Sequence, residues 1–377
     1  MVKSVLQNFF IMKIFFDHQV YSQQMYGGIS RYFCELIERI NRTSAHSAHL
    51  SLLWSNNVHL QEYKFNTLLY PFSKRNRLLF KSNQSLNYLD NLINYYDIYH
   101  ATYFNNFLIK HIGPKPIVAT FYDMIYERLS SQFAELSNDK VIIHQKKIMS
   151  EQATHLIAIS ENTKQDMVQI LNVDPKKITV IHLSSSFPTN IKLIDNLANV
   201  DYPYLLYVGN RFGYKNFIFF LKAISQLLTQ YQITLICAGG NAFTFSEQDS
   251  IRALSLTKLV KYYDINDKIL QGLYQRAIAF IFPSLYEGFG IPILEAFSCG
   301  CPCIISNSSA LPEIADDAAL YFDPKNEQSI VTAVERIILN SNLRKDLIKR
   351  GRERLSHFSW QRTVEQTLNL YQGLLEK

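Results

Sequence analysis

The sequence lacks the long apolar runs of a membrane protein. No segment reaches the roughly 18 consecutive apolar residues that a membrane-spanning helix requires. The apolar opening MVKSVLQNFFIM ends at Lys13, and no small-residue cleavage site of a secretory signal follows it. We therefore expect a protein that is soluble, or that attaches to a membrane surface without crossing the membrane.

The cysteines lack any metal-binding spacing. The chain has five of them, and its C-x-C-P-C run has no second cluster: Cys34, Cys237, Cys299, Cys301 and Cys303. Structural zinc sites usually combine two such clusters, so buried thiols are the expected role here. Unpaired thiols are typical of the reducing cytosol, and the predicted location is cytoplasmic.

The sequence also lacks the signatures of nucleic-acid-binding modules. No RNP-like, zinc-finger or helix-turn-helix pattern is present, and nucleic acid is not expected as a partner. The net charge of +6 is mild. Residues 1–188 carry most of the surplus, with 19 Lys and Arg against 14 Asp and Glu. This bias fits an anionic surface or ligand, and it fits a solvated basic face equally well.

The chain is long enough for two domains. A single core rarely grows to 377 residues. Strand-like apolar runs alternate with helical patterns in both halves, which predicts an α/β fold of two parallel, doubly wound sheets. The polar stretch 184–203 contains proline and has no clear period, and we interpret it as a linker. The predicted domains are 1–188 and 200–355, with a helix of about 356–377 that could return to the first domain.

The stretch EGFGIPILE contains the strongest signal for a ligand. Pro292 suits the first position of a helix, and Gly288 and Gly290 keep the preceding loop slim. A helix N-terminus binds anions such as phosphate. The carboxylates of Glu287 and Glu295 would accept hydrogen bonds from sugar hydroxyls, so the pattern indicates a nucleotide-sugar. The alternative is that both glutamates only favour the helix dipole.

A second stretch, YVGNRFGYKNF, places two cations after a strand. Arg211 and Lys215 follow Gly209 closely. Two cations beside a glycine turn can neutralise a diphosphate leaving group as its charge develops. An exposed basic turn is the alternative interpretation.

Together these stretches resemble the retaining glycosyltransferases of family 4, which have the GT-B fold. The similar segment runs from YVG through FPSLYEGFGIPILEAFSCGCP to the following LPE, and it covers most of residues 201–325. Near the N-terminus, FDHQ followed by YGGISRYF resembles the glycine-rich loop of this family. The resemblance implies two Rossmann-like domains facing across a cleft, the first for the acceptor and the second for the donor.

The resemblance also implies roles for the matching residues. Glu295 would hold the ribose diol of the donor, and Glu287 would orient the hydroxyls of its sugar. The backbone amides of one loop would hold the distal phosphate and the sugar: Gly288, Phe289, Gly290 and Ile291.

The cations and the other glycines would surround the diphosphate. Arg211 and Lys215 would stabilise it as it departs, beside Gly209, while Gly27 and Gly28 approach it from the first domain. Such enzymes usually need no metal because the cations replace it. No Asp-x-Asp pair follows these strands, so we expect no metal and no other cofactor.

Several positions depart from the family pattern. Many relatives carry the arginine at the position of Asn210, and we assign its role to Arg211 instead. His100 is similar to a histidine near the donor sugar, and it is a candidate catalytic residue, although a histidine at a strand end more often belongs to the core or the surface. Tyr122 replaces a histidine before Asp123, and this pair is expected near the acceptor.

The predicted function is the transfer of a sugar from a nucleotide-diphosphate sugar to a hydroxyl, with retention of the anomeric configuration. The acceptor would be a saccharide or a lipid-linked saccharide in surface polysaccharide synthesis. Two alternatives remain open at this point. One is a sugar-nucleotide epimerase or phosphorylase of the same fold, and the other is a non-catalytic protein that binds nucleotide-sugars.

One segment suggests contact with an anionic membrane surface. LLYPFSKRNRLLFK, residues 68–81, mixes basic with apolar side chains: Lys74, Arg75, Arg77 and Lys81 with Tyr70, Phe72, Leu78, Leu79 and Phe80. The cations would meet anionic headgroups while the apolar side chains enter the bilayer. Alternatively, the apolar side chains face the core of the domain and the protein is free in solution.

Overall fold

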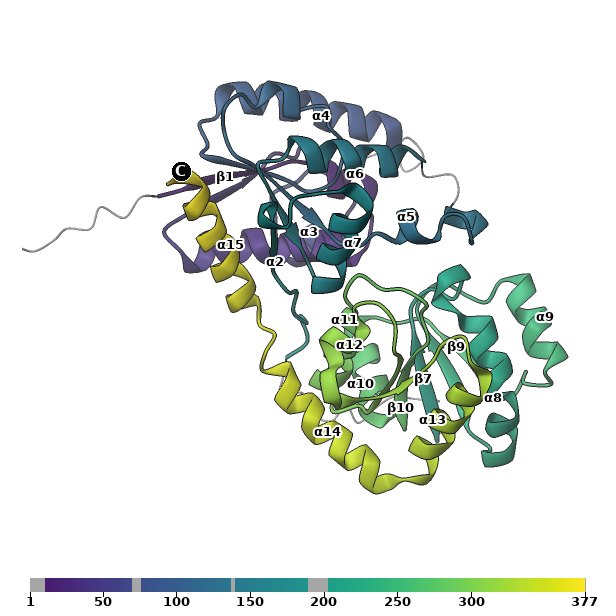
Figure 1. The fold of residues 1–377 in the computed structure, drawn as a ribbon. Coiled ribbons are helices and arrows are strands. Elements are labelled where there is room, and N and C mark those ends of the chain that lie inside the picture. Colours follow the sequence, from purple (N-terminus) through teal and green to yellow (C-terminus); the bar gives the residue numbers. More distant parts are fainter. Residues whose placement is uncertain (1–10, 70–75, 137–139, 189–202, 377) are drawn as a thin grey trace, which may run out of the picture.

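The computed structural model describes residues 11–69, 76–136, 140–188 and 203–376. Most of the predicted linker, and Tyr70, Phe72, Lys74 and Arg75 of the basic segment, lie outside the described residues. Two bodies, each built on one sheet, follow one another along the chain (Figure 1). The predicted α/β fold with two Rossmann-like domains is confirmed.

The first sheet has six parallel strands in the order β2-β1-β3-β4-β5-β6. Its strands are β1 Lys13–Phe16, β2 Ser47–Leu50, β3 Ile98–Ala101, β4 Ile117–Phe121, β5 His155–Ala158 and β6 Ile178–Val180. Its helices are α1 Gln19–Gln23, α2 Gly28–Thr43, α3 Val58–Glu62, α4 Asn76–Ile93, α5 Ile125–Leu129, α6 Lys140–Gln152 and α7 Glu161–Leu171. The central strands are short apolar runs that helices cover on both faces, as in other parallel sheets.

The second sheet is also parallel, in the order β12-β11-β10-β7-β8-β9. Its strands are β7 Tyr204–Val208, β8 Thr234–Ala238, β9 Val260–Tyr263, β10 Ala279–Phe282, β11 Cys303–Ser306 and β12 Ala319–Phe322. Its helices are α8 Phe217–Tyr231, α9 Phe245–Ala253, α10 Asp267–Arg276, α11 Ile291–Ser298, α12 Leu311–Ala315, α13 Glu327–Leu339 and α14 Ser341–Leu355. Numbered from β7, this is the strand order of dinucleotide-binding domains.

The strand orders determine where a ligand can bind. The order reverses between β1 and β3 in the first sheet, and between β7 and β10 in the second. Open α/β sheets bind ligands at the carboxyl ends of the strands beside such a reversal. The segments that follow β1, β7 and β10 are therefore the expected site. The loops after β7 and β10 contain glycine, and Gly27 and Gly28 lie after α1, at the start of α2.

The last helix, α15 Trp360–Leu375, leaves the second domain and packs against α2 of the first (Figure 1). The Thr363 hydroxyl donates to the carbonyl of His182 at 2.8 Å. Tyr371 is fully buried beside the first sheet. The two domains are thus joined by this helix as well as by the chain between β6 and β7.

The described part of the chain contains neither a candidate membrane-spanning helix nor a candidate metal cluster. There, no helix combines the length and the apolar character needed to cross a bilayer. Within the same residues, no group of three His, Cys, Asp or Glu side chains is arranged to hold a metal ion.

Candidate functional site

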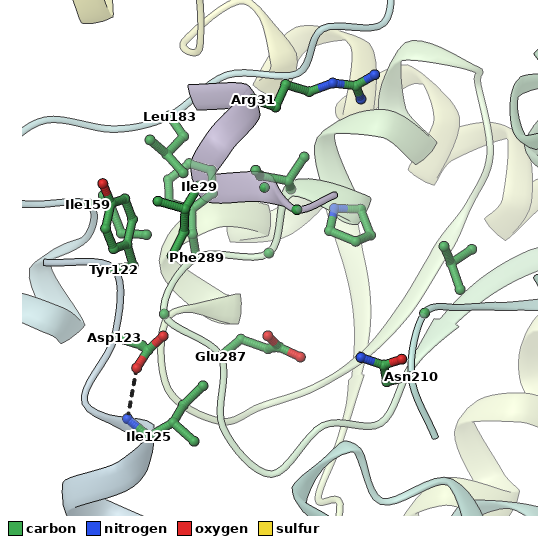
Figure 2. A pocket seen from close by; sticks show the side chains of 18 of the residues that line it. Ile29, Arg31, Tyr122, Asp123, Ile125, Ile159, Leu183, Asn210, Glu287 and Phe289 are labelled. Carbon is green, nitrogen blue, oxygen red and sulfur yellow. Dashed lines mark hydrogen bonds between the residues drawn. The ribbon is translucent and has the colours of Figure 1, made fainter. Parts of the chain in front are cut away.

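A cavity of about 480 Å³ lies between the two domains, at the carboxyl ends of their strands. Most of its lining residues lie within 26–31 and 122–125 of the first domain and within 208–215 and 287–295 of the second. The others are His59, Ile159, Leu183 and Phe282. Figure 2 shows Glu287 and Asn210 beside this space, with Ile29 and Arg31 of the first domain at its border and Arg31 at the top of the view.

The loop before α11 is shaped by its glycines. Gly290 has φ +110°, a conformation that glycine adopts without strain, and Pro292 occupies the first turn of α11. Gly288 has a different reason to be glycine, because a Cβ there would lie 1.8 Å from the carbonyl oxygen of Tyr122. The Ser160 hydroxyl donates to the Gly288 carbonyl at 2.7 Å. This loop therefore contacts the other domain directly, which the sequence did not indicate.

Glu287 is held by a cation and a hydroxyl at the wall of the cavity. The Lys215 ammonium lies 2.6 Å from its Oε1, and the Ser284 hydroxyl donates to the same oxygen at 2.6 Å. The backbone N–H of Glu287 donates to Ser309 Oγ at 2.8 Å. The carboxylate is fixed in orientation, and Lys215 keeps two further N–H donors for a ligand.

Glu295 lies on α11 and, like Glu287, is 9% exposed. Tyr274 donates to its Oε2 at 3.3 Å. Burial raises the pKa of Glu295 to about 7, while the nearby Arg31 guanidinium opposes this shift. A carboxyl group with such a pKa can change charge near neutral pH.

Arg31 is a cavity residue that we did not predict from the sequence. It lies in the first turn of α2, just after Gly27 and Gly28, which line the cavity as expected. Its Nη2 donates to Asp267 Oδ2 of α10 at 2.5 Å, so the contact joins the two domains. The motif YGGISRYF contained a signal, since a helix that brings glycines to a site also brings the residue one turn later.

The structure contradicts the prediction that Arg211 faces the ligand. Arg211 is 4% exposed and does not line the cavity. Its Nε donates to Glu247 at 2.9 Å, and its terminal nitrogens donate to the carbonyls of Gly239 at 3.0 Å and Asn241 at 2.7 Å. The guanidinium is used to hold the turn after β8, and its neighbour Asn210 lines the cavity instead.

His100, predicted as a candidate catalytic residue, does not line the cavity. His100 is fully buried, and its ring nitrogens bond the Tyr371 hydroxyl at 2.5 Å and Thr120 Oγ1 at 2.9 Å. Burial lowers the pKa of His100 to about 3, so the ring is neutral. Thr102, at the second position of the family pair, is buried and hydrogen-bonded to Asp17. His100 therefore fastens α15 to the first sheet and does not face a substrate.

The remaining predicted residues come together at the cavity. Tyr122 and Asp123 line it beside the Glu287 loop, and Asp123 Oδ1 accepts from the backbone N–H of Ile125 at 3.1 Å (Figure 2). The buried Lys146 ammonium donates to the Asp123 carbonyl at 2.8 Å. Five further predicted residues line the same space: Gly209, Gly288, Phe289, Gly290 and Ile291.

Comparison with known proteins agrees with this geometry. Residues 190–354 match the family described as "Glycosyl transferases group 1", and residues 26–183 match "Glycosyltransferase Family 4". Together the two matches cover most of the chain, which belongs to the family 4, group 1 glycosyltransferases. O-antigen chain mannosyltransferase B of Escherichia coli is 28% identical over 294 residues, 74% of this chain and 74% of that protein.

Solved structures with the same architecture show that the fold is GT-B. Sucrose-phosphate synthase of Thermosynechococcus elongatus superposes with a TM-score of 0.76 at 18% identity, over 97% of this chain and 99% of that chain. HepE of Anabaena, solved with UDP and glucose, gives a TM-score of 0.71 at 16% identity, over 96% of this chain and 99% of that chain. At these identities the likeness shows the fold alone.

Proposed function

We propose that this glycosyltransferase moves a sugar from a nucleotide-diphosphate sugar to a hydroxyl group, with retention of the anomeric configuration. One observation carries the proposal. Glu287 and Glu295 flank the N-terminus of α11 inside a cavity between two Rossmann-like domains, with Lys215 beside the first of them. A helix N-terminus and a cation suit a diphosphate, and carboxylates suit hydroxyls.

The two glutamates receive different roles because their surroundings differ. Glu295 is buried near the nucleotide end of the site and would accept hydrogen bonds from the ribose diol. Glu287 is ion-paired with Lys215 and would orient the reacting sugar, while Lys215 contacts the phosphate attached to it. Asp123, which lies on the first domain beside the Glu287 loop, would contact the acceptor.

The proposed reaction balances without a separate general base. The bond between the anomeric carbon and the phosphate oxygen breaks, and its electron pair leaves with the nucleoside diphosphate. The acceptor oxygen forms a bond to the same face of that carbon. A phosphate oxygen of the leaving group takes the acceptor proton. Neutral, buried His100 takes no part in this sequence.

We infer the class of acceptor from the name of a similar protein. The name of the Escherichia coli relative places that protein in O-antigen synthesis and makes it a mannosyltransferase. We propose a saccharide or lipid-linked saccharide acceptor of surface polysaccharide synthesis, and we choose mannose as the first donor sugar to test. The enzyme would act in the cytoplasm, in contact with an anionic membrane surface.

Transfer assays test the proposal. Thermal shifts with UDP-, GDP- and dTDP-sugars would identify the donor, because a ligand that prefers the folded state raises the melting temperature. Product NMR would then report the anomeric configuration. Donor hydrolysis or epimerisation without transfer would favour the alternative enzyme classes. Binding without turnover for every acceptor would favour a non-catalytic binding protein.

Chelation tests the proposal that no metal takes part. We expect full transfer activity after EDTA treatment, because side-chain cations would stabilise the leaving group. Activity that is lost on chelation and restored by Mg²⁺ or Mn²⁺ would contradict this.

A further inference from the structure

Because Arg211 holds the turn after β8, it does not supply positive charge to a diphosphate in the cavity. A departing diphosphate gains negative charge, and preorganised cations lower the barrier to its departure. Among the described residues, Arg31 and Lys215 are the lysine and arginine side chains that line the cavity. Lys215 is already paired with Glu287 at 2.6 Å. A second cation is therefore needed, and Arg31 is available.

The contacts of Arg31 leave its Nε–H group without a partner among the described residues. The side chain is 16% exposed, and Nη2 donates to Asp267. Its Nε is buried and has no hydrogen-bond partner among the described residues. A buried donor without a partner is costly, and a phosphate oxygen would satisfy it.

The position of Arg31 indicates which phosphate it would meet. Its charge acts on Glu295, which we assign to the ribose. Figure 2 shows Arg31 and Glu287 on separate sides of the cavity. Gly28 begins α2 three residues before Arg31, so the backbone amides of that first turn lie on the same side. Arg31 thus belongs to the nucleoside end of a bound donor, and Lys215 to the sugar end.

We infer that Arg31 is the second cation that contacts the donor diphosphate, at the phosphate nearer the nucleoside, in the role predicted for Arg211. This inference rests on the proposed function. Lys215 comes from the second domain and Arg31 from the first. The diphosphate is therefore fully neutralised only when the two domains hold both cations at the same cavity, as the lining of this cavity by Arg31 and Lys215 allows.

Binding measurements on Arg31→Gln test the inference. Arg42→Gln is the matched control, because Arg42 is on the same helix, is 65% exposed and does not line the cavity. Isothermal titration would use UDP, GDP and dTDP, each against its own nucleoside. We expect Arg31→Gln to weaken the preferred diphosphate at least tenfold, and to leave its nucleoside within about twofold. Arg31→Lys should recover part of the loss.

Turnover provides the second readout. With the preferred donor sugar, Arg31→Gln should lower kcat as well as donor affinity, because the cation acts on charge that grows in the transition state. An unchanged diphosphate affinity, or an equal loss for diphosphate and nucleoside, would overturn the inference and leave the proposed function intact. If the wild-type protein binds no nucleoside diphosphate, both proposals fail together.

Discussion

At the scale of single residues, Glu287 and Glu295 allow a division of labour to be tested. Glu295→Gln should raise the donor KM by tenfold or more, since hydrogen bonds to a charged group are worth about 1.5–3 kcal/mol, and leave kcat nearly unchanged. Glu287→Gln should mainly lower kcat, because it orients the reacting sugar and holds Lys215. Steady-state kinetics separate the two, and equal losses of donor affinity with kcat untouched would contradict the assignment.

The raised pKa of Glu295 predicts a pH dependence of binding. Burial raises this pKa from 4.5 to about 7. The ribose diol requires the carboxylate as acceptor, so nucleoside affinity should rise as the pH increases through about 7. The stability of the folded protein changes in the opposite direction. Burial favours the protonated form of Glu295 in the folded state, so this contribution to stability is present below pH 4.5 and is lost as the pH rises from 4.5 to about 7. Titration calorimetry between pH 6 and 8 should show the rise in the wild-type protein and a flat profile in Glu295→Gln.

The residues that the sequence predicted well belong to local motifs. Glu287, Glu295 and their glycines lie within one loop and one helix, so spacing and turn chemistry suffice to bring them together. Arg31 was missed because its partner Asp267 is 236 residues away. Arg211 was misassigned for a similar reason, since the carbonyls that bury it come from the turn after another strand. Spacing along the chain cannot distinguish a cation that faces a ligand from one that holds a neighbouring loop.

At the scale of elements, α4 has an unusual distribution of polar and apolar residues. Its buried side carries three asparagines. Asn83 accepts from the amides of Leu53 and Trp54, Asn87 donates to the Ser51 carbonyl, and Asn91 donates to the His111 carbonyl. Its outward side exposes four large apolar residues: Leu78, Leu89, Leu92 and Ile93. The helix therefore satisfies the backbone of its own domain with amides and leaves these four apolar residues exposed.

This distribution revises the predicted membrane contact. Leu79 is buried and Phe80 packs on His18, so these two cannot enter a bilayer as predicted. The outward side of α4 replaces them, at the end of the first domain remote from the second (Figure 1). Arg77 and Lys81 are exposed on this helix, while its acidic residue Asp90 is paired with His49. A basic, apolar face suits anionic lipid, whereas like charges would oppose contact with a second copy.

Vesicle sedimentation tests this surface. The wild-type protein should bind anionic vesicles at low salt, and bind weakly to neutral vesicles or at high salt. Leu89→Gln with Leu92→Gln should reduce binding several-fold. Leu339→Gln, at a residue of α13 that is 63% exposed, should not. Binding that ignores lipid charge, or survives the α4 double variant, would contradict the proposal; a change from dimer to monomer in light scattering would indicate a second copy instead.

At the scale of the whole molecule, Glu313 fastens the two domains together near the site. Its carboxylate, from α12 of the second domain, accepts from the backbone N–H groups of Glu161 at 2.8 Å and Asn162 at 3.1 Å, in the first turn of α7. His182 Nε2 lies 2.7 Å from the same carboxylate. An acidic residue at a helix N-terminus is favourable, and here the helix belongs to the other domain.

This contact should loosen in acid. Burial opposes ionisation of Glu313, but the hydrogen bonds from His182 and the two amides prevail and lower its pKa below 4.5. A lowered pKa means that the contact stabilises the closed arrangement above pH 4.5 and is lost as the pH falls through the folded-state value. The cavity depends on both domains, so donor binding should weaken with it.

Hydrogen exchange tests this at neutral pH, where Glu313→Gln removes the charge. The peptide that covers residues 155–165 should exchange several-fold faster in Glu313→Gln, because charge-assisted bonds to its amides weaken. Glu353→Gln, at a site on α14 that is 67% exposed, is the control and should exchange like the wild type. Diphosphate affinity should fall in Glu313→Gln, since Arg31 and Lys215 reach the donor from opposite domains. If Glu313→Gln speeds exchange of this peptide but leaves diphosphate affinity unchanged, the Glu313 contact does not control donor binding.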